Sequence, residues 1–267
     1  MTAPRAVEPS SFDRVVVIFN PHSTGKAPQM AEQLRADLAR RLPHIPVQLS
    51  PTERAGHGRE LARQAAGTGR PLVVSVSGDG GYNEVVDGVM QADNPDAVCA
   101  VMAAGNANDH RRATRERPLA DAIVAGEVRR IDLLRLTIGA GVGARTQYAH
   151  SYIGMGLTPI VAIDLEKGGK GSLREIVSVV RTFARFRPFT IELDDGRRHR
   201  FDSLLFANIA QMAKYATLSD SDQPDDGRFE VVTLTPTPLQ LDGELLTLDA
   251  GTSVHVAIAP AALATIG

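Results

Sequence analysis

Apolar residues follow two patterns in the first half of the chain, short continuous runs and helical stripes. The runs are rich in valine and isoleucine, as expected of strands buried on both faces of a parallel sheet, and cover residues 14–19, 47–49, 72–76 and 98–102. Between and after them, apolar residues recur at helical spacing over residues 30–42, 60–66, 82–89 and 121–125. This alternation predicts a doubly wound α/β domain, a parallel sheet with helices on both faces.

Beyond residue 128 the pattern changes to short strand-like runs separated by glycine, aspartate or proline turns. The runs cover residues 129–138, 145–153, 189–193, 201–209, 229–234, 245–248 and 254–258. They predict an antiparallel β lobe. We therefore place a first domain at residues 12–127 and a second at residues 128–258. Whether the C-terminal segment, residues 259–267, returns to the first domain is left open.

One helix interrupts the second half, at residues 172–186, and starts with a capping box from Ser172 to Glu175. One of its faces carries Arg174, Arg181 and Arg185. Two interpretations remain for this helix. It could touch a membrane surface through its basic face, or pack on the β lobe with that face solvated.

A glycine-rich turn follows the apolar run at residues 72–76 and is the candidate for chemistry. Gly78, Gly80 and Gly81 leave the backbone accessible, and the apolar stripe from Tyr82 opens a helix. A strand, a glycine turn and a helix N-terminus together make a phosphate cradle, although an ordinary tight turn uses the same residues. Asp79 would repel a bare phosphate but suits a phosphate that arrives with Mg²⁺.

The loop after residues 14–19 resembles a phosphate loop of the Walker type but fails the pattern twice. Asn20 stands in place of the first glycine, and Ala27 stands where a hydroxyl should follow Lys26. We therefore reject a P-loop NTPase. The loop remains either a second wall of a nucleotide site or a plain polar turn.

Composition and charge narrow the class of protein. With 267 residues, 43% hydrophobic and 22% charged, the chain is globular, and no apolar run is long enough to span a bilayer. Residues 1–11 lack the apolar core of a secretory signal, so we expect a cytoplasmic protein, with a peripheral position at the inner membrane face left open. A net charge of −2 argues against nucleic acid as a partner. Cys99 is the single cysteine, which excludes an internal disulfide.

Six signals in order resemble the diacylglycerol kinase catalytic-domain family, which includes bacterial lipid kinases and is related to sphingosine, ceramide and, more distantly, NAD kinases. They run through most of the chain: Asn20-Pro21 with Gly25, the Ser77-Gly-Asp-Gly80 turn with Asn83-Glu84, Gly105 with Asn108-Asp109, Gly154 with Gly156, Asp226-Gly227, and Leu241-Asp-Gly-Glu244. The resemblance implies an α/β nucleotide-binding lobe and a β-sandwich lobe with the active site in the cleft between them. This agrees with the layout predicted above.

The resemblance also implies residue roles. The ATP site would be lined by Asn20, Thr52, Gly78, Asp79, Gly80, Gly81, Asn83, Glu84, Asn106 and Asn108. Asp79 would join the polar network around the phosphates and magnesium. Asp226 would hold a structural Mg²⁺, helped by backbone carbonyls near Gln223 and Arg228. Glu244 would be the general base that takes a proton from the acceptor hydroxyl.

Two positions depart from the family pattern, because Gly81 and Asn106 stand where threonine is common. The expected function is an ATP- and Mg²⁺-dependent lipid kinase acting on a diacylglycerol-like hydroxyl. The alternatives are an NAD-kinase-like enzyme with a soluble acceptor, and a nucleotide-binding regulator with weak catalysis, which the two departures would suit. A lipid or amphiphilic substrate and transient membrane contact are the expected partners, and a homodimer is left open.

Overall fold

The computed structural model describes residues 12–23, 26–104, 117–156, 189–192, 196–209, 211–212, 216–217, 225–235, 239–241, 244–246 and 253–266. The expected helix at residues 172–186 lies outside these ranges. Among the described helices, none combines the length and the apolar character needed to cross a bilayer.

The first half of the chain alternates strands and helices as predicted. The strands are β1 (Arg14–Phe19), β2 (Val47–Pro51), β3 (Pro71–Ser77) and β4 (Val98–Ala103), and the helices are α1 (Ala27–Arg41), α2 (His57–Ala66), α3 (Asp79–Gln91) and α5 (Leu119–Ala125). The strands pair in the order β2-β1-β3-β4, and every pair is parallel. The carboxyl ends of all four strands therefore meet at one edge.

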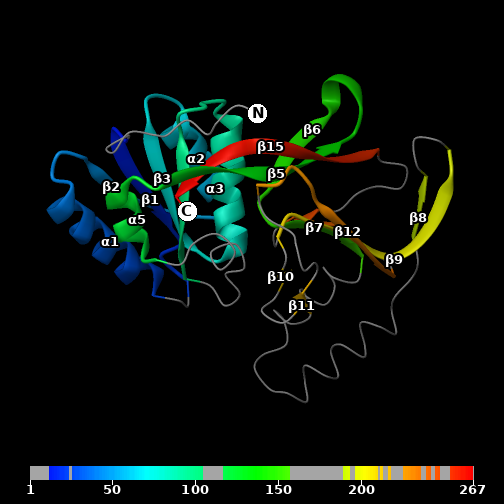
Figure 1. Ribbon diagram of the computed structural model, residues 1–267, viewed down its shortest axis with the longest axis horizontal. Helices are drawn as coiled ribbons and strands as arrows, with labels where there is room; N and C mark the ends of the chain where they lie inside the picture. The colour runs from blue at the N-terminus through cyan, green and yellow to red at the C-terminus, as the bar shows by residue number, and fades with distance from the viewer. Residues whose placement is uncertain are drawn as a thin grey trace, which may run out of the picture.

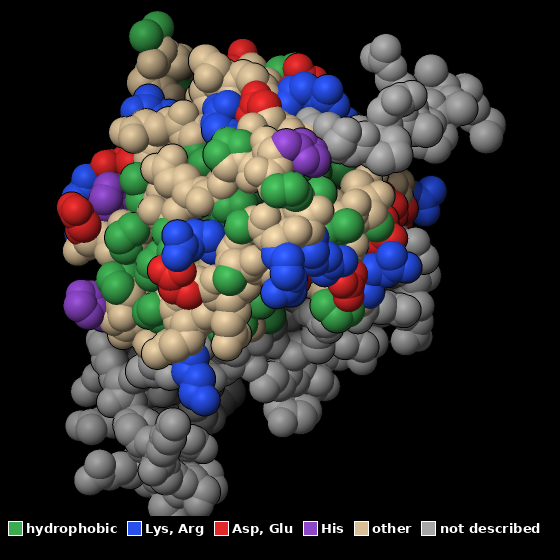
Figure 2. Space-filling model, turned by 90° about the vertical axis from the view of Figure 1, so that its left-hand side faces the viewer, with side chains coloured by type: hydrophobic (Ala, Val, Ile, Leu, Met, Phe, Trp, Pro, Cys, Tyr) green, Lys and Arg blue, Asp and Glu red, His purple; other side chains and the backbone are tan. Residues whose placement is uncertain are grey.

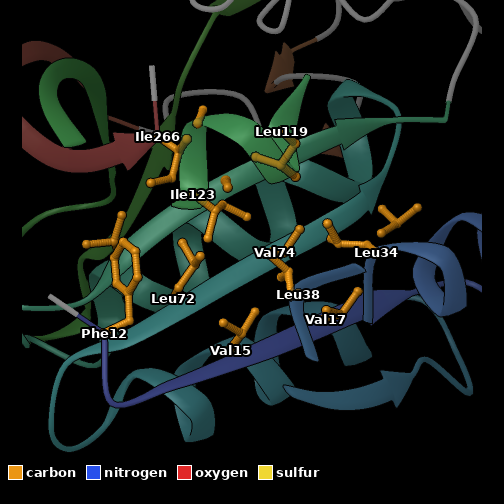
Figure 3. Close-up of a cluster of buried hydrophobic side chains, with 14 of the residues drawn as sticks. Phe12, Val15, Val17, Leu34, Leu38, Leu72, Val74, Leu119, Ile123 and Ile266 are labelled. Carbon is orange, nitrogen blue, oxygen red and sulfur yellow. The ribbon is translucent and has the colours of Figure 1, made fainter. Parts of the chain in front are cut away.

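Two apolar clusters show why both faces of these strands are apolar. Helices α1 and α5 cover one face, where Leu34, Leu38 and Ile123 pack on Val15, Val17 and other strand residues (Figure 3). Helices α2 and α3 cover the other face, where Ala62, Val85 and Val86 pack on Val16 and Val73. The expectation that these strands are buried on both faces is thus confirmed, and the fold is mixed α/β.

Figure 2 shows basic and acidic side chains next to one another on the side of the molecule that α1 and β2 form in Figure 1.

The same sheet continues into the second half of the chain. Strands β15 (Val254–Ile266), β5 (Val128–Ile138) and β6 (Arg145–Ala149) extend it to seven strands, in the order β2-β1-β3-β4-β15-β5-β6. β15 is parallel to β4 and antiparallel to β5, and β5 is antiparallel to β6. A short turn, η1 (Gly141–Gly143), lies between β5 and β6. β5 and β6 were expected in the second domain but are hydrogen-bonded into this sheet. The domain limits 12–127, 128–258 and 259–267 stay a prediction.

A second sheet is antiparallel throughout. It comprises β7 (Tyr152–Gly156), β8 (Phe189–Glu192), β9 (Arg198–Ala207), β12 (Glu230–Thr235), β13 (Leu239–Leu241) and β14 (Glu244–Leu246). Its order is β12-β9-β7-β13-β14, with β8 paired to β9. A separate pair joins β10 (Gln211–Met212) to β11 (Ala216–Thr217).

The two sheets meet at a third apolar cluster. Leu134 and Leu136 of β5 pack with Ile153 of β7, and partly buried residues of β15 and β9 surround them. In Figure 1, β5 and β15 run side by side from the helical part of the molecule to this second sheet. One expectation was wrong here: residues 145–153 are not one strand. The chain leaves β6 at Ala149 and enters β7 at Tyr152, and these strands belong to different sheets.

Candidate active site

The loops at the carboxyl ends of the parallel strands lie beside one another. The backbone N–H of Thr52, after β2, donates to the carbonyl of Phe19 at the end of β1, at 2.8 Å. Ala104, after β4, donates in the same way to Ser77 at the end of β3, at 2.9 Å. In the exposed loop after β1, Asn20 accepts the N–H of His22 on Oδ1 at 2.9 Å. The loops after β1 and β2 are thus held together, as are those after β3 and β4.

The glycine turn after β3 becomes the N-terminus of α3. Gly78 is the N-cap residue, in extended conformation (φ −86°, ψ −172°) and without a side-chain cap, and the helix begins at Asp79 rather than Tyr82. The first amides of a helix have no partner within the helix, and its dipole is positive at that end. Because Gly80 and Gly81 carry no side chains, an anionic group can approach these amides closely. The turn has the local geometry of a phosphate site, with the half-buried Asp79 beside it.

The hydroxyls of two serines lie next to this turn. Ser77 donates its hydroxyl to the carbonyl of Gly78 at 2.9 Å, and its Oγ lies 2.7 Å from that of Ser75. A Cβ atom at Gly81 would stand 2.7 Å from the Cβ of Ser77. With serine at position 77, there is therefore no room for a threonine side chain at position 81.

Glu84 lies on α3 but its carboxylate holds α2. Its Oε1 accepts the N–H of Gly56 and its Oε2 that of Gly58, each at 3.1 Å. Gly56 is the N-cap of α2 and has no side chain of its own to serve as a cap. Glu84 thus supplies the cap from the neighbouring helix and fixes the loop that contains Thr52 against α3. Asn83, beside it, is 1% exposed.

A buried histidine lies between the first turn of α3 and the second sheet. His150, in the link from β6 to β7, is fully buried, and its Nε2 is 3.2 Å from the carbonyl oxygen of Asp79. Its Nδ1 is 2.6 Å from the hydroxyl of Ser151, and its ring centroid is 4.8 Å from that of Tyr82. The turn that carries Asp79 is therefore tied to the point where the chain crosses between sheets.

A buried carboxylate ties the Asp226 turn to the first sheet. Asp132, on β5 and 2% exposed, accepts the N–H of Gly227 on Oδ2 at 2.5 Å and that of Ala261 on Oδ1 at 2.6 Å. Ala261 lies at the bulge of β15, at a φ of 48°. Asp226 itself is exposed, and its Oδ1 accepts the N–H of Arg228 at 2.9 Å. Asp132 holds the turn by its backbone and leaves the Asp226 side chain at the surface.

Strand register brings the remaining candidates to the same end of the second sheet. Ile153, near the start of β7, pairs with Leu241, and Leu241 pairs with Glu244. On the other side of β7, Tyr152 pairs with Ala207, which pairs with Glu230, just after the Asp226 turn. Asn208 follows Ala207, is fully buried, and donates its side-chain amide to the carbonyls of Asp132 and His150 at 2.9 and 3.3 Å. The backbone of Glu244, the Asp226 turn and the His150 link therefore share one end of the sheet.

Some predicted site residues lie outside the described ranges, namely Asn106, Asn108 and Gln223. Within the part of the chain that the structure describes, acidic, histidine and cysteine side chains form no cluster of three that could hold a metal ion. Sequence reasoning missed His150, Asp132 and Asn208. The signal available was a polar residue inside an apolar strand-like run, because such residues are buried only when they have partners.

The chain is similar to proteins of known class. Residues 14–136 match the model of the family described as diacylglycerol kinase catalytic domain. The resemblance to that family is confirmed. The diacylglycerol kinase of Bacillus subtilis (strain 168) is 28% identical over 191 residues, which are 67% of this chain and 60% of the relative. The matched segment spans less than two thirds of that relative's length.

Solved structures show the same fold. A diacylglycerol kinase from Bacillus anthracis str. Sterne superposes with a TM-score of 0.70 at 17% identity, over 96% of this chain and 97% of that one. Yeast NADH kinase, solved in complex with NADH, superposes with a TM-score of 0.51 at 13% identity, over 92% and 78% of the two chains. The fold of the diacylglycerol kinase family is thus shared over nearly the whole chain, and that of NADH kinase more distantly.

Proposed function

We propose that this protein is an ATP- and Mg²⁺-dependent lipid kinase that transfers the γ-phosphoryl group of ATP to a hydroxyl of a diacylglycerol-like lipid. One observation carries the proposal. The N-terminus of α3, which would bind phosphate, is contacted by His150. His150 lies at the end of the second sheet that also carries the Asp226 turn and the backbone of Glu244. Phosphoryl transfer needs the nucleotide, the metal and the acceptor base within one site, and this arrangement would bring them together.

The nucleotide would bind at the carboxyl edge of the parallel strands. Asn20, Thr52 and the segment from Gly78 to Glu84 line this edge, and Asn106 and Asn108 follow from the family pattern. The triphosphate would lie against the backbone amides at the start of α3. Those amides and the helix dipole favour negative charge, which is the charge that must be stabilised during transfer.

The carboxylates fit magnesium chemistry. Mg²⁺ is held in kinase sites by one or two carboxylates, water and substrate phosphates, so a cluster of three acidic residues is not required. Asp79 would join the network around the phosphates and the metal. The exposed Asp226, together with backbone carbonyls near Gln223 and Arg228, would hold a structural Mg²⁺. Bound magnesium would neutralise charge on the triphosphate.

Glu244 would act as the general base toward the acceptor hydroxyl. Its backbone lies opposite Leu241 on β13, at the same sheet end as the His150 link to α3. A carboxylate there can accept the hydroxyl proton as the new phosphate bond forms. A lipid acceptor also implies transient contact between the protein and a membrane surface.

A soluble acceptor is the second candidate, and the fold shared with yeast NADH kinase favours it. A regulator without catalysis is less consistent with the site, because Asp79, Asp226 and Glu244 are all retained. Gly81, one of the two departures that suggested such a regulator, has a steric explanation in Ser77.

The test is phosphate transfer by the purified protein. Radiolabelled Mg·ATP is supplied with mixed vesicles that contain diacylglycerol, with vesicles that contain ceramide or sphingosine, and with NAD⁺ in solution. We expect label in a lipid phosphomonoester from the diacylglycerol vesicles. Label in NADP⁺ alone would establish the soluble-acceptor alternative, and nucleotide binding without any transfer would establish the regulator.

A further inference from the structure

His150 has the contacts of a residue that positions the phosphate turn. Its Nε2 lies 3.2 Å from the backbone carbonyl of Asp79, and its ring packs against Tyr82 on the next turn of α3. The backbone here is also held, because Asn208 donates its side-chain amide to the carbonyl of His150 and its backbone N–H to that of Ser151. The residue is fully buried, so these contacts are protected from competing water.

The chemistry of the contact fixes which ring nitrogen carries hydrogen. A carbonyl oxygen can only accept, so Nε2 donates to Asp79. Nδ1 then accepts the hydroxyl hydrogen of Ser151 at 2.6 Å when the ring is neutral. The imidazole thus joins a backbone acceptor on α3 to a hydroxyl donor at the start of the second sheet. An apolar side chain of the same volume could pack against Tyr82 but could not make this connection.

We infer that His150 is a positioning residue for phosphoryl transfer: it fixes the first turn of α3, and with it the Asp79 carboxylate, relative to the sheet end that carries Asp226 and Glu244. This inference rests on the proposed function. The two halves of the site are supplied by different sheets, so their spacing depends on the contacts that cross between them. Transfer rates are sensitive to such spacing, because misplacement by about 1 Å can cost roughly 100-fold in rate.

The test compares two substitutions that differ in one donor. His150→Gln keeps an N–H near the position of Nε2, whereas His150→Leu keeps the volume and removes the donor. Val89→Ala is the control for stability, because Val89 is buried on the same helix, far along it from Asp79. All proteins are assayed well below their melting temperatures, with kcat and the KM for lipid measured separately.

We expect kcat to fall about tenfold or more in His150→Leu, with the KM for lipid little changed, and to stay within about threefold of wild type in His150→Gln. Val89→Ala should lower the melting temperature and leave kcat unchanged. Equal kcat values for the leucine and glutamine variants, or wild-type kcat in the leucine variant, would overturn the inference.

A second readout needs no substrate. Amide hydrogen exchange in the peptide over residues 79–84 should be faster in His150→Leu than in His150→Gln, with residues 85–91 unaffected. If wild-type protein phosphorylates no acceptor, the proposed function fails, yet the exchange data still decide whether His150 fixes the turn. Unchanged exchange in both variants would refute the positioning role by itself.

Discussion

The side chain of Ser77 occupies the space that a side chain at Gly81 would need. A Cβ atom on Gly81 would lie 2.7 Å from the Cβ and 2.8 Å from the Oγ of Ser77, closer than such atoms approach in proteins. The two positions therefore depend on each other. Where the family commonly carries a hydroxyl at position 81, this chain carries one at position 77, at the end of β3 and next to the same turn.

This dependence predicts a rescue. Gly81→Thr alone should destabilise the protein by about 1–3 kcal/mol, since it overpacks the turn, and should weaken binding of Mg·ATP. Adding Ser77→Gly should restore most of both losses, because it removes the atoms that clash. Urea unfolding and nucleotide titration of the single and double variants form a double-mutant cycle. Additive effects of the two substitutions would contradict the steric account.

Glu244 is expected to matter for turnover and not for folding. Glu244→Gln removes the base but keeps the size of the side chain, so kcat should fall by about 10²–10⁴-fold while the unfolding free energy stays close to that of wild type. Glu192→Gln is a suitable control, because Glu192 belongs to the same sheet and makes an exposed ion pair with Arg198. If Glu244→Gln turns over at the wild-type rate, the proton acceptor is another group.

Glu84 is expected to act through stability. Glu84→Ala leaves the N–H groups of Gly56 and Gly58 without their acceptor and should cost about 1–2 kcal/mol of unfolding free energy. Glu84→Gln keeps one acceptor oxygen and should lose less. Thermal and urea unfolding give the stability, and nucleotide titration shows whether affinity changes. A large loss of affinity at unchanged stability would place Glu84 on the nucleotide instead.

Asp132 is expected to stabilise the fold through both of its carboxylate oxygens. Its two oxygens accept two backbone N–H groups, so Asp132→Ala should lower the unfolding free energy by about 3 kcal/mol. Asp132→Asn keeps one acceptor oxygen but its amide nitrogen cannot accept from the other N–H, so it should recover only part of the loss. The measurement is urea unfolding of the three proteins. An asparagine variant as stable as wild type would show that the two bonds contribute little.

Cys99 provides a test of pH dependence. Complete burial raises the pKa of its thiol far above the ordinary value, so the folded protein keeps the neutral thiol. In the unfolded chain the thiol ionises near pH 8.5 to 9. This group therefore favours folding below that pH, and its contribution is lost as pH rises further. We expect a thiol reagent at pH 8 to label Cys99 only after denaturation, and labelling of native protein would contradict its burial.

The parallel strands could be predicted from the sequence because burial on both faces of the sheet requires a continuous run of apolar residues, which is visible locally. The prediction failed at residues 145–153 because His150 and Ser151 interrupt the run without any turn residue. The break is fixed by Asn208, which is distant in sequence and binds both backbones. The order of the motifs indicated that Asp79 and Asp226 belong to the same region of the molecule. It could not indicate Asp132, whose partners at Gly227 and Ala261 are long-range contacts.

The position of β15 has a consequence for how the chain reaches its final form. This strand is the last element of the described chain, yet it lies between β4 and β5 and takes part in all three apolar clusters. During synthesis the parallel strands emerge with an unpaired edge at β4. One partner of β5, the strand β15, is synthesised more than a hundred residues later. Such long-range pairing slows folding. Because β15 joins β4 to β5, we expect the sheet that carries the site to be complete only after β15 has paired with both strands.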